Sequence, residues 1–78
     1  MVEKAENYLR DQGFGQLRVR VHGDLARIEL TDADFAEAVQ PGFRKRLSET
    51  FRAIGFLYVT LDVQGYRMGS MNEVLKWT

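Results

Sequence analysis

The sequence contains no cysteine, and this absence excludes several kinds of chemistry. A chain of 78 residues without cysteine can form no disulfide framework, no thiolate-ligated zinc or iron–sulfur site and no thiol nucleophile. Its one histidine is too few for a histidine-based metal cage. A Ser/His/Asp constellation, a pair of catalytic carboxylates and a phosphate-cradling GxxxxGK loop are also missing. We therefore expect no metal site and no self-sufficient active site in this chain.

The chain also lacks net charge and long apolar runs. Eleven basic residues balance eleven acidic ones, whereas proteins that bind nucleic acid through its phosphates are usually basic. The apolar runs are too short to span a bilayer, and the N-terminus lacks the apolar core of a signal peptide. We therefore expect a soluble cytoplasmic protein whose partners include neither a membrane nor, in the first place, nucleic acid.

The apolar residues that are present follow regular spacings, and these predict the first half of the fold. The segment from Val2 to Gln12 has the spacing of a helix, which ends at Gly13. Residues 17–22 and 25–30 both alternate between apolar and polar side chains, and Gly23-Asp24 between them predicts a tight hairpin. A two-residue loop also fixes the register. It pairs Val21 with Ala26, Val19 with Ile28 and Leu17 with Leu30 on the apolar face, and Arg20 with Arg27 and Arg18 with Glu29 on the other.

The second half predicts two helices, a strand and a last short helix. Residues 31–40 form a short helix capped by Thr31, which Pro41-Gly42 ends. A longer helix follows and ends at Gly55-Phe56, and its inner stripe is Phe43, Leu47, Thr50, Phe51 and Ile54. Residues 57–63 alternate again, and Ser70-x-x-Glu73 is a capping box that opens a helix to Trp77. The simplest arrangement is a single α+β domain over residues 1–78. It has two layers, a small three-stranded sheet (the hairpin plus the later strand) and helices packed on one face.

The sheet face opposite the predicted helices is polar and rich in arginine. It carries Arg18, Arg20, Arg27, Glu29, Tyr58, Thr60 and Asp62. Arg20 opposite Arg27 is an unfavourable like-charge pair, which an acidic side chain, solvent or a bound anion should compensate. Guanidinium groups bind phosphate well, but antiparallel sheets also commonly leave one polar face to water. The pattern alone therefore fits either an anion site or a solvated face.

A second candidate anion site lies between Arg67 and Ser70, at the start of the last predicted helix. The free N–H groups of a helix N-terminus favour an anion, and Gly69 permits its close approach. The alternative is that Ser70 and Glu73 only cap the helix.

Two long stretches resemble LarE-like proteins, which are ATP-dependent sacrificial sulfur transferases of the PP-loop superfamily. Residues 18–29 resemble the family segment R-V-R-x-H-G-D-x-A-R-I-E. Residues 58–72 resemble its closing segment Y-V-T-L-D-x-x-G-Y-R-x-G-S-x-N. The order and separation of the two segments also fit, so the chain is similar to the C-terminal, non-ATPase domain of this family.

The resemblance implies a role in assembling a nickel-pincer nucleotide cofactor. Family members activate a nicotinate-derived carboxylate with ATP and then deliver sulfur, while the C-terminal domain adds arginines to the active-site wall and contacts between subunits. Carried to this sequence, Arg18 and Arg20 would bind a substrate phosphate, Glu29 would order that site, and Arg67 and Ser70 would contribute from the closing segment.

The chain departs from the family in two respects. The PP-loop S-G-G-x-D-S is missing, and so is any cysteine. We therefore expect no cofactor in this chain: ATP and Mg would bind a PP-loop ATPase domain, supplied in cis or in trans. The other expected partners are further copies of the chain and a phosphate-bearing small molecule.

Two further interpretations remain. The element order also resembles that of type II KH domains, which clamp nucleic acid with a G-x-x-G loop between two helices. The corresponding residues 39–44 lack that loop. The other interpretation is a small standalone scaffold that keeps the fold without a binding function.

Overall fold

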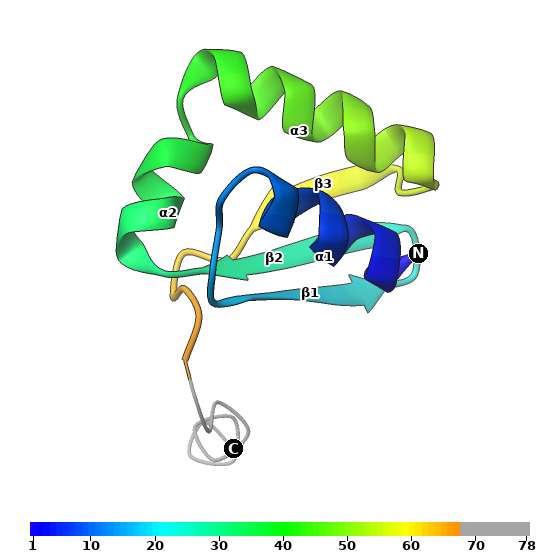
Figure 1. Cartoon of the computed structure of the whole chain (residues 1–78). Coiled ribbons are helices and arrows are strands. Elements are labelled where there is room, and N and C mark those ends of the chain that lie inside the picture. The colour runs from blue at the N-terminus through cyan, green and yellow to red at the C-terminus, as the bar shows by residue number, and fades with distance from the viewer. Residues whose placement is uncertain (68–78) are drawn as a thin grey trace.

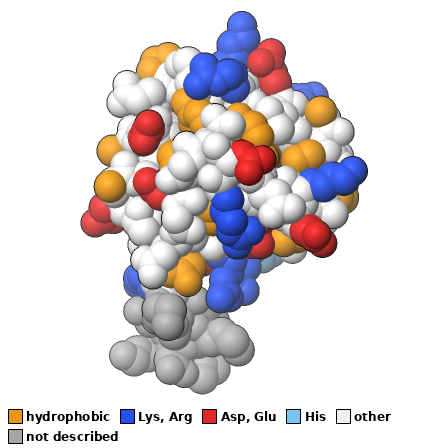
Figure 2. All heavy atoms as spheres, viewed as in Figure 1, with side chains coloured by type: hydrophobic (Ala, Val, Ile, Leu, Met, Phe, Trp, Pro, Cys, Tyr) orange, Lys and Arg blue, Asp and Glu red, His pale blue; other side chains and the backbone are white. Residues whose placement is uncertain are grey.

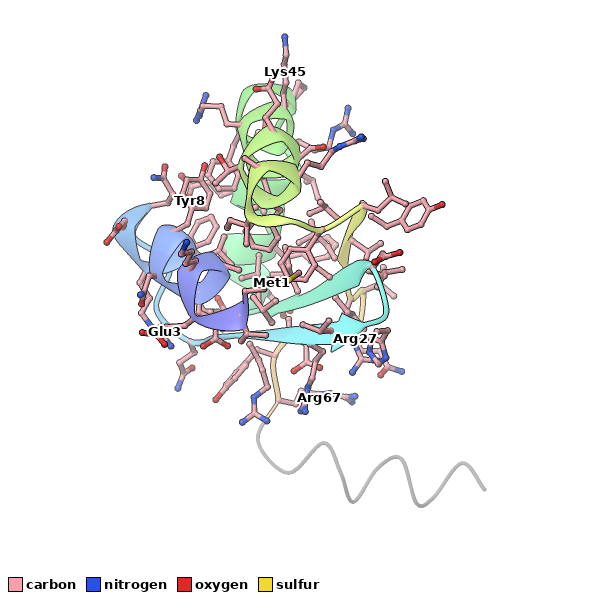
Figure 3. All side chains as sticks on the ribbon, turned by 90° about the vertical axis from the view of Figure 1, so that its right-hand side faces the viewer. Met1, Glu3, Tyr8, Arg27, Lys45 and Arg67 are labelled. Atoms are coloured by element: carbon pink, nitrogen blue, oxygen red, sulfur yellow. The ribbon has the colours of Figure 1, made fainter. Side chains whose placement is uncertain are left out.

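A computed structural model describes residues 1–67 of the chain as three helices and a three-stranded sheet (Figure 1). The elements are α1 (Val2–Asp11), β1 (Leu17–His22), β2 (Leu25–Leu30), α2 (Asp32–Ala38), α3 (Pro41–Ile54) and β3 (Tyr58–Leu61). The helices cover one face of the sheet, and Figure 3 shows α1 and α3 together on that side of the strands. The predicted α+β fold with two layers is confirmed. No helix in residues 1–67 is long and apolar enough to cross a membrane.

The core lies between the helices and the sheet. It is made of buried apolar side chains from every element except β3 and from the two corners that precede strands: Ala5, Leu9, Phe14, Leu17, Val19, Ala26, Ile28, Leu30, Ala38, Phe43, Leu47, Phe51 and Phe56. On α3, the residues of the predicted inner stripe are buried or half-buried, as helical spacing requires. The apolar face of the hairpin is therefore the floor of the core, and the arginine-rich face points away from it.

Two matching corners carry the chain from helix to strand. After α1, the amides of Gly13 and Phe14 donate to the carbonyls of Arg10 and Leu9, at 3.0 and 3.2 Å. After α3, the amides at positions 55 and 56 make the same pair of bonds, both at 3.1 Å. This is the Schellman pattern, in which the residue after the glycine folds back over the last turn. Each corner delivers a buried phenylalanine to the core immediately before a strand.

The strand order is β1-β2-β3, with β2 in the centre. The β1–β2 pair is antiparallel and has the register predicted from the two-residue turn at every position. By contrast, β3 runs parallel to β2, so that Arg27 lies beside Thr60. A parallel neighbour needs a crossover, and α2 and α3 form it over the helical face.

The two outer strands differ in how their free edges are covered. On β1, the amide of Val19 donates to the Glu6 carboxylate of α1 at 3.1 Å. The same carboxylate lies 3.7 Å from Arg10. On β3, no further strand is present within residues 1–67. Among residues 1–67, one edge of the sheet is thus partly occupied by a helix side chain and the other is left open.

Two details differ from the prediction. Pro41 begins α3 rather than only ending α2, because a proline at the first helical position loses no intrahelical hydrogen bond. β3 is shorter than residues 57–63, and Leu57 and Val63 are 49% and 86% exposed. The chain turns away at Asp62, whose carbonyl accepts from the amide of Gly65 at 3.0 Å. The predicted cap of α2 is present, since Thr31 Oγ1 accepts from the amide of Asp34 at 3.4 Å.

Candidate anion-binding site

Five charged side chains share the sheet face that points away from the helices, and we call this set the arginine face. Its members are Arg18, Arg20, Arg27, Glu29 and Asp62. Across the sheet, Arg18 pairs with Glu29 and Arg20 with Arg27. Asp62 follows β3 and donates its amide to the carbonyl of Ile28 at 2.8 Å, which brings it next to this group. The alternation of the strands therefore gathers three guanidinium groups and two carboxylates on one surface.

Glu29 is the centre of the arginine face. Although it is charged, the residue is only 4% exposed. One of its oxygens, Oε2, accepts a hydrogen bond from Arg27 Nη2 at 3.4 Å and lies 3.6 Å from Arg20 Nε. A buried carboxylate is stabilised only when such partners compensate its lost hydration. The like-charge pair expected from the register, Arg20 opposite Arg27, is thus held together by an acid that both arginines share.

Arg27 connects this centre to β3. Its Nε lies 3.6 Å from Asp62 Oδ2. Asp62 in turn accepts from the amide of Gln64 at 2.9 Å, which fixes the carboxylate in the turn after the strand. Arg27 therefore contacts one acid on its own strand and one on the neighbouring strand, and it is the most constrained of the three arginines.

The arginine face retains positive charge that these acids do not compensate. Within residues 1–67, Arg18 forms no ion pair, and its side chain is exposed. The Nε atoms of Arg20 and Arg27 are enclosed and have no hydrogen-bond partner in the described residues, since their carboxylate neighbours lie at 3.6 Å. The guanidinium that an anion can reach without first breaking an ion pair is therefore that of Arg18.

Arg67 reaches the same side of the sheet from the segment after β3. The amide of Tyr66 donates to the carbonyl of Leu30 at 2.8 Å, which holds this segment against the end of β2. Arg67 Nη2 donates to Gln64 Oε1 at 2.9 Å. Figure 3 shows Arg67 and Arg27 both on the side away from the helices. Ser70, and with it the predicted capping box, lies outside the described residues.

The other polar residues predicted on this face have different surroundings. Thr60 Oγ1 donates to the carbonyl of Ala26 at 2.7 Å, so this hydroxyl supports the β2–β3 pairing. Tyr58 is 59% exposed at the start of β3. Sequence reasoning placed Arg27 and Asp62 on the face but not among the candidate site residues. Their contact depends on β3 lying beside β2, which the alternation of each strand alone does not reveal.

The rest of the surface shows no concentration of one charge on the side drawn in Figure 2, where basic and acidic side chains are interspersed. Within residues 1–67, no group of three or more His, Asp or Glu side chains could hold a metal ion. The arginine face is thus the one concentration of guanidinium groups that the described part of the sheet presents, and its chemistry suits the binding of an anion.

Comparisons with known proteins give two similar sequences. The chain is 49% identical over 74 residues to an uncharacterized protein of Synechocystis. The matched residues are 95% of the chain and 28% of that protein. It is 46% identical over 74 residues to a pyridinium-3,5-bisthiocarboxylic acid mononucleotide synthase of Lactiplantibacillus plantarum. These 74 residues are 95% of the chain and 26% of the synthase. No family model matches.

The chain thus spans about a quarter of the length of these relatives. The synthase is a LarE protein, so its similarity to this chain supports the resemblance to LarE-like proteins that the two sequence segments indicated. Over almost its whole length, the chain is similar to a part of this synthase.

Proposed function

We propose that the chain is an accessory domain of an ATP-dependent sulfur transferase and that its arginine face holds the phosphate of a mononucleotide-like substrate. The observation that carries the proposal is the uncompensated positive charge around Arg18 and Arg20, next to the buried Glu29 carboxylate that contacts Arg20. The Lactiplantibacillus relative is named as the synthase of a mononucleotide. A mononucleotide carries a phosphate, which is an anion that arginine binds well.

The spacing of the two arginines supports a phosphate rather than a smaller ion. Arg18 and Arg20 lie two residues apart on β1, so their backbones are separated by about 7 Å along the strand. Two long side chains at that spacing can close on opposite sides of one tetrahedral anion. Glu29 would keep Arg20 extended, and Arg67 would approach from the end of β2 at Leu30, where β1 carries Arg18. Ser70 is part of the same proposal by resemblance.

In this proposal, the ATP-dependent sulfur transfer takes place on another domain. ATP and Mg would bind a PP-loop ATPase domain in cis or in trans, and this chain would position the substrate beside it. Self-association of the chain, which the resemblance also implies, is part of the proposal. Sedimentation of the chain over a range of concentrations tests it, since a monomer at every concentration would contradict it.

Titration with inorganic phosphate and with a nucleoside monophosphate, followed by NMR, tests the phosphate site. We expect the amides of β1 to shift with phosphate and not with the same concentration of chloride. Arg18→Ala or Arg20→Ala should weaken binding roughly 10–100-fold, because each removes a charge-assisted contact of about 1.5–3 kcal/mol. Arg52→Ala, an exposed arginine on α3, is the matched control and should bind normally. Retained binding by the Arg18→Ala/Arg20→Ala double variant would sink the site.

The same titration separates the two remaining interpretations. A scaffold without a binding function should not distinguish phosphate from chloride. The helix–strand–strand–helix–helix–strand order fits the order expected for a KH-like module. However, only Val39 and Gln40 separate α2 from α3, so no G-x-x-G loop connects them. Salt-dependent binding of single-stranded RNA would favour that module over the accessory domain.

A further inference from the structure

In the described part of the chain, the outer edge of β3 is open and is bordered by a mainly apolar groove. Hydrogen bonds from the amides of Tyr58 and Asp62 run toward β2, to the carbonyls of Asp24 and Ile28 at 3.1 and 2.8 Å. Because backbone groups alternate along a strand, the amides of Val59 and Leu61 point the other way, to the side where residues 1–67 supply no strand. These two positions therefore offer backbone hydrogen bonds that a neighbouring chain segment can complete.

The groove lies where the side chains of such a segment would go. It has a volume of about 250 Å³, and its apolar walls are Phe35 of α2, Val39 directly after α2, Leu47 of α3, and Val59 and Leu61 of β3. Arg44, Ser48 and Thr60 complete the lining. It is on the helical side of the sheet and directly beside the open edge. Small-molecule sites usually measure about 300–1,000 Å³, so this groove suits one or two side chains better than a whole ligand.

The surface around the edge is apolar as well. Leu57 is 49% exposed and Val63 is 86% exposed, and they flank β3 at its two ends. Val39 is 37% exposed at the rim of the groove. Proteins usually blunt an open edge strand with charge or cover it, because it can otherwise pair with another chain. The contrast within this sheet is direct: β1 is covered at Val19 by Glu6, and β3 has no equivalent contact in residues 1–67.

We infer that the open edge of β3 and the adjoining groove bind an extended segment of the part of a synthase-like protein that this chain does not span. The inference rests on the proposed function in one respect, namely that the chain works beside such a part. The chain covers 26% of the synthase, so most of that protein is available to supply a segment. Backbone bonds to Val59 and Leu61 would provide affinity, and every second side chain of the segment would enter the groove.

Hydrogen exchange tests this surface in two proteins. One is the chain alone; the other is a chimera in which the chain replaces the 74 matched residues of the Lactiplantibacillus synthase. We expect the peptide that covers β3 to take up deuterium quickly in the chain alone and to gain protection at two amides in the chimera. The peptide that covers β1, whose edge the inference does not use, should exchange equally in both proteins.

A pair of variants, one at the end of α2 and one within it, makes the test specific. Val39→Glu places a charge in the groove and should restore fast exchange of β3 in the chimera. Ala33→Glu adds the same charge at an exposed position of α2 that does not line the groove, and it should leave the protection intact.

Equal exchange of β3 in the two proteins would overturn the inference. Slow exchange of β3 in the chain alone would also overturn it. If that protection rises with protein concentration, a second copy covers the edge; if it does not, the chain's own C-terminal residues do. A chain that does not bind phosphate would refute the proposed phosphate site but would leave these exchange rates unchanged. Failure of the proposed function and failure of this inference are therefore distinguishable.

Discussion

Replacing Glu29 with Gln tests whether the buried carboxylate holds the arginine face together. Its side chain is 6% exposed and lies 3.4 Å from Arg27 and 3.6 Å from Arg20. Gln keeps the volume but removes the charge, so the two arginines would face each other without their shared partner. Breaking a fully buried ion pair costs about 3–5 kcal/mol, and breaking an exposed one costs about 0–1 kcal/mol. Arg20 and Arg27 are 31% and 39% exposed, so water screens both and we expect a loss of about 2 kcal/mol in the free energy of unfolding.

A loss of this size is easily measured in so small a domain. A chain of 78 residues is expected to have a free energy of unfolding of about 4–12 kcal/mol. A decrease of about 2 kcal/mol corresponds to a fall in Tm of roughly 8–16 °C. Urea and thermal unfolding followed by circular dichroism would measure both quantities. Glu49→Gln, the same chemical change at an exposed position of α3, should stay within about 0.5 kcal/mol of the parent. If Glu29→Gln unfolds together with this control, the carboxylate does not stabilise the face and our account of it is wrong.

Two further predictions concern the backbone. Gly65→Ala should destabilise the chain by more than the roughly 1–2 kcal/mol that a left-handed conformation costs Ala, because the new Cβ would lie 2.9 Å from the carbonyl oxygen of Leu30. Gly23→Ala is the control, since Gly23 also has a positive φ but has no atom within 4 Å of the added Cβ. Equal urea midpoints for the two variants would contradict the close approach at Gly65. Glu6→Ala should release the amide of Val19 to fast hydrogen exchange and cost about 1 kcal/mol; an unchanged exchange rate at Val19 would show that the carboxylate does not protect this edge.

The hairpin could be predicted from the sequence because its determinants are local. A two-residue turn fixes which residues face each other, and a period of two fixes which face each side chain joins. Both rules apply to neighbours in the chain, so the pairing of Arg18 with Glu29 and of Arg20 with Arg27 follows without knowledge of the rest of the fold. The helix ends at Gly13 and Gly55 are local in the same sense.

The position and length of β3 could not be predicted in this way. The alternation of residues 57–63 extends beyond the paired strand, and Val63 has the apolar character of a strand residue yet is 86% exposed. Only the crossover through α2 and α3 determines that β3 lies beside β2 and parallel to it. The contact between Arg27 and Asp62 depends on that neighbour, which is why alternation alone did not bring these two residues into the candidate site.

The central position of β2 also divides the arginine face into a local part and a part that depends on distant residues. The local part is the β1–β2 hairpin, which carries Arg18, Arg20, Arg27 and Glu29. The β2–β3 pair joins residues such as Ala26 and Thr60, which are 34 positions apart, so closing that loop costs more chain entropy. The basic part of the face and its shared carboxylate therefore depend only on contacts between neighbours in the chain. Asp62 joins them only when β3 docks, so local opening of β3 would raise the positive charge of this face without disturbing the hairpin that carries it.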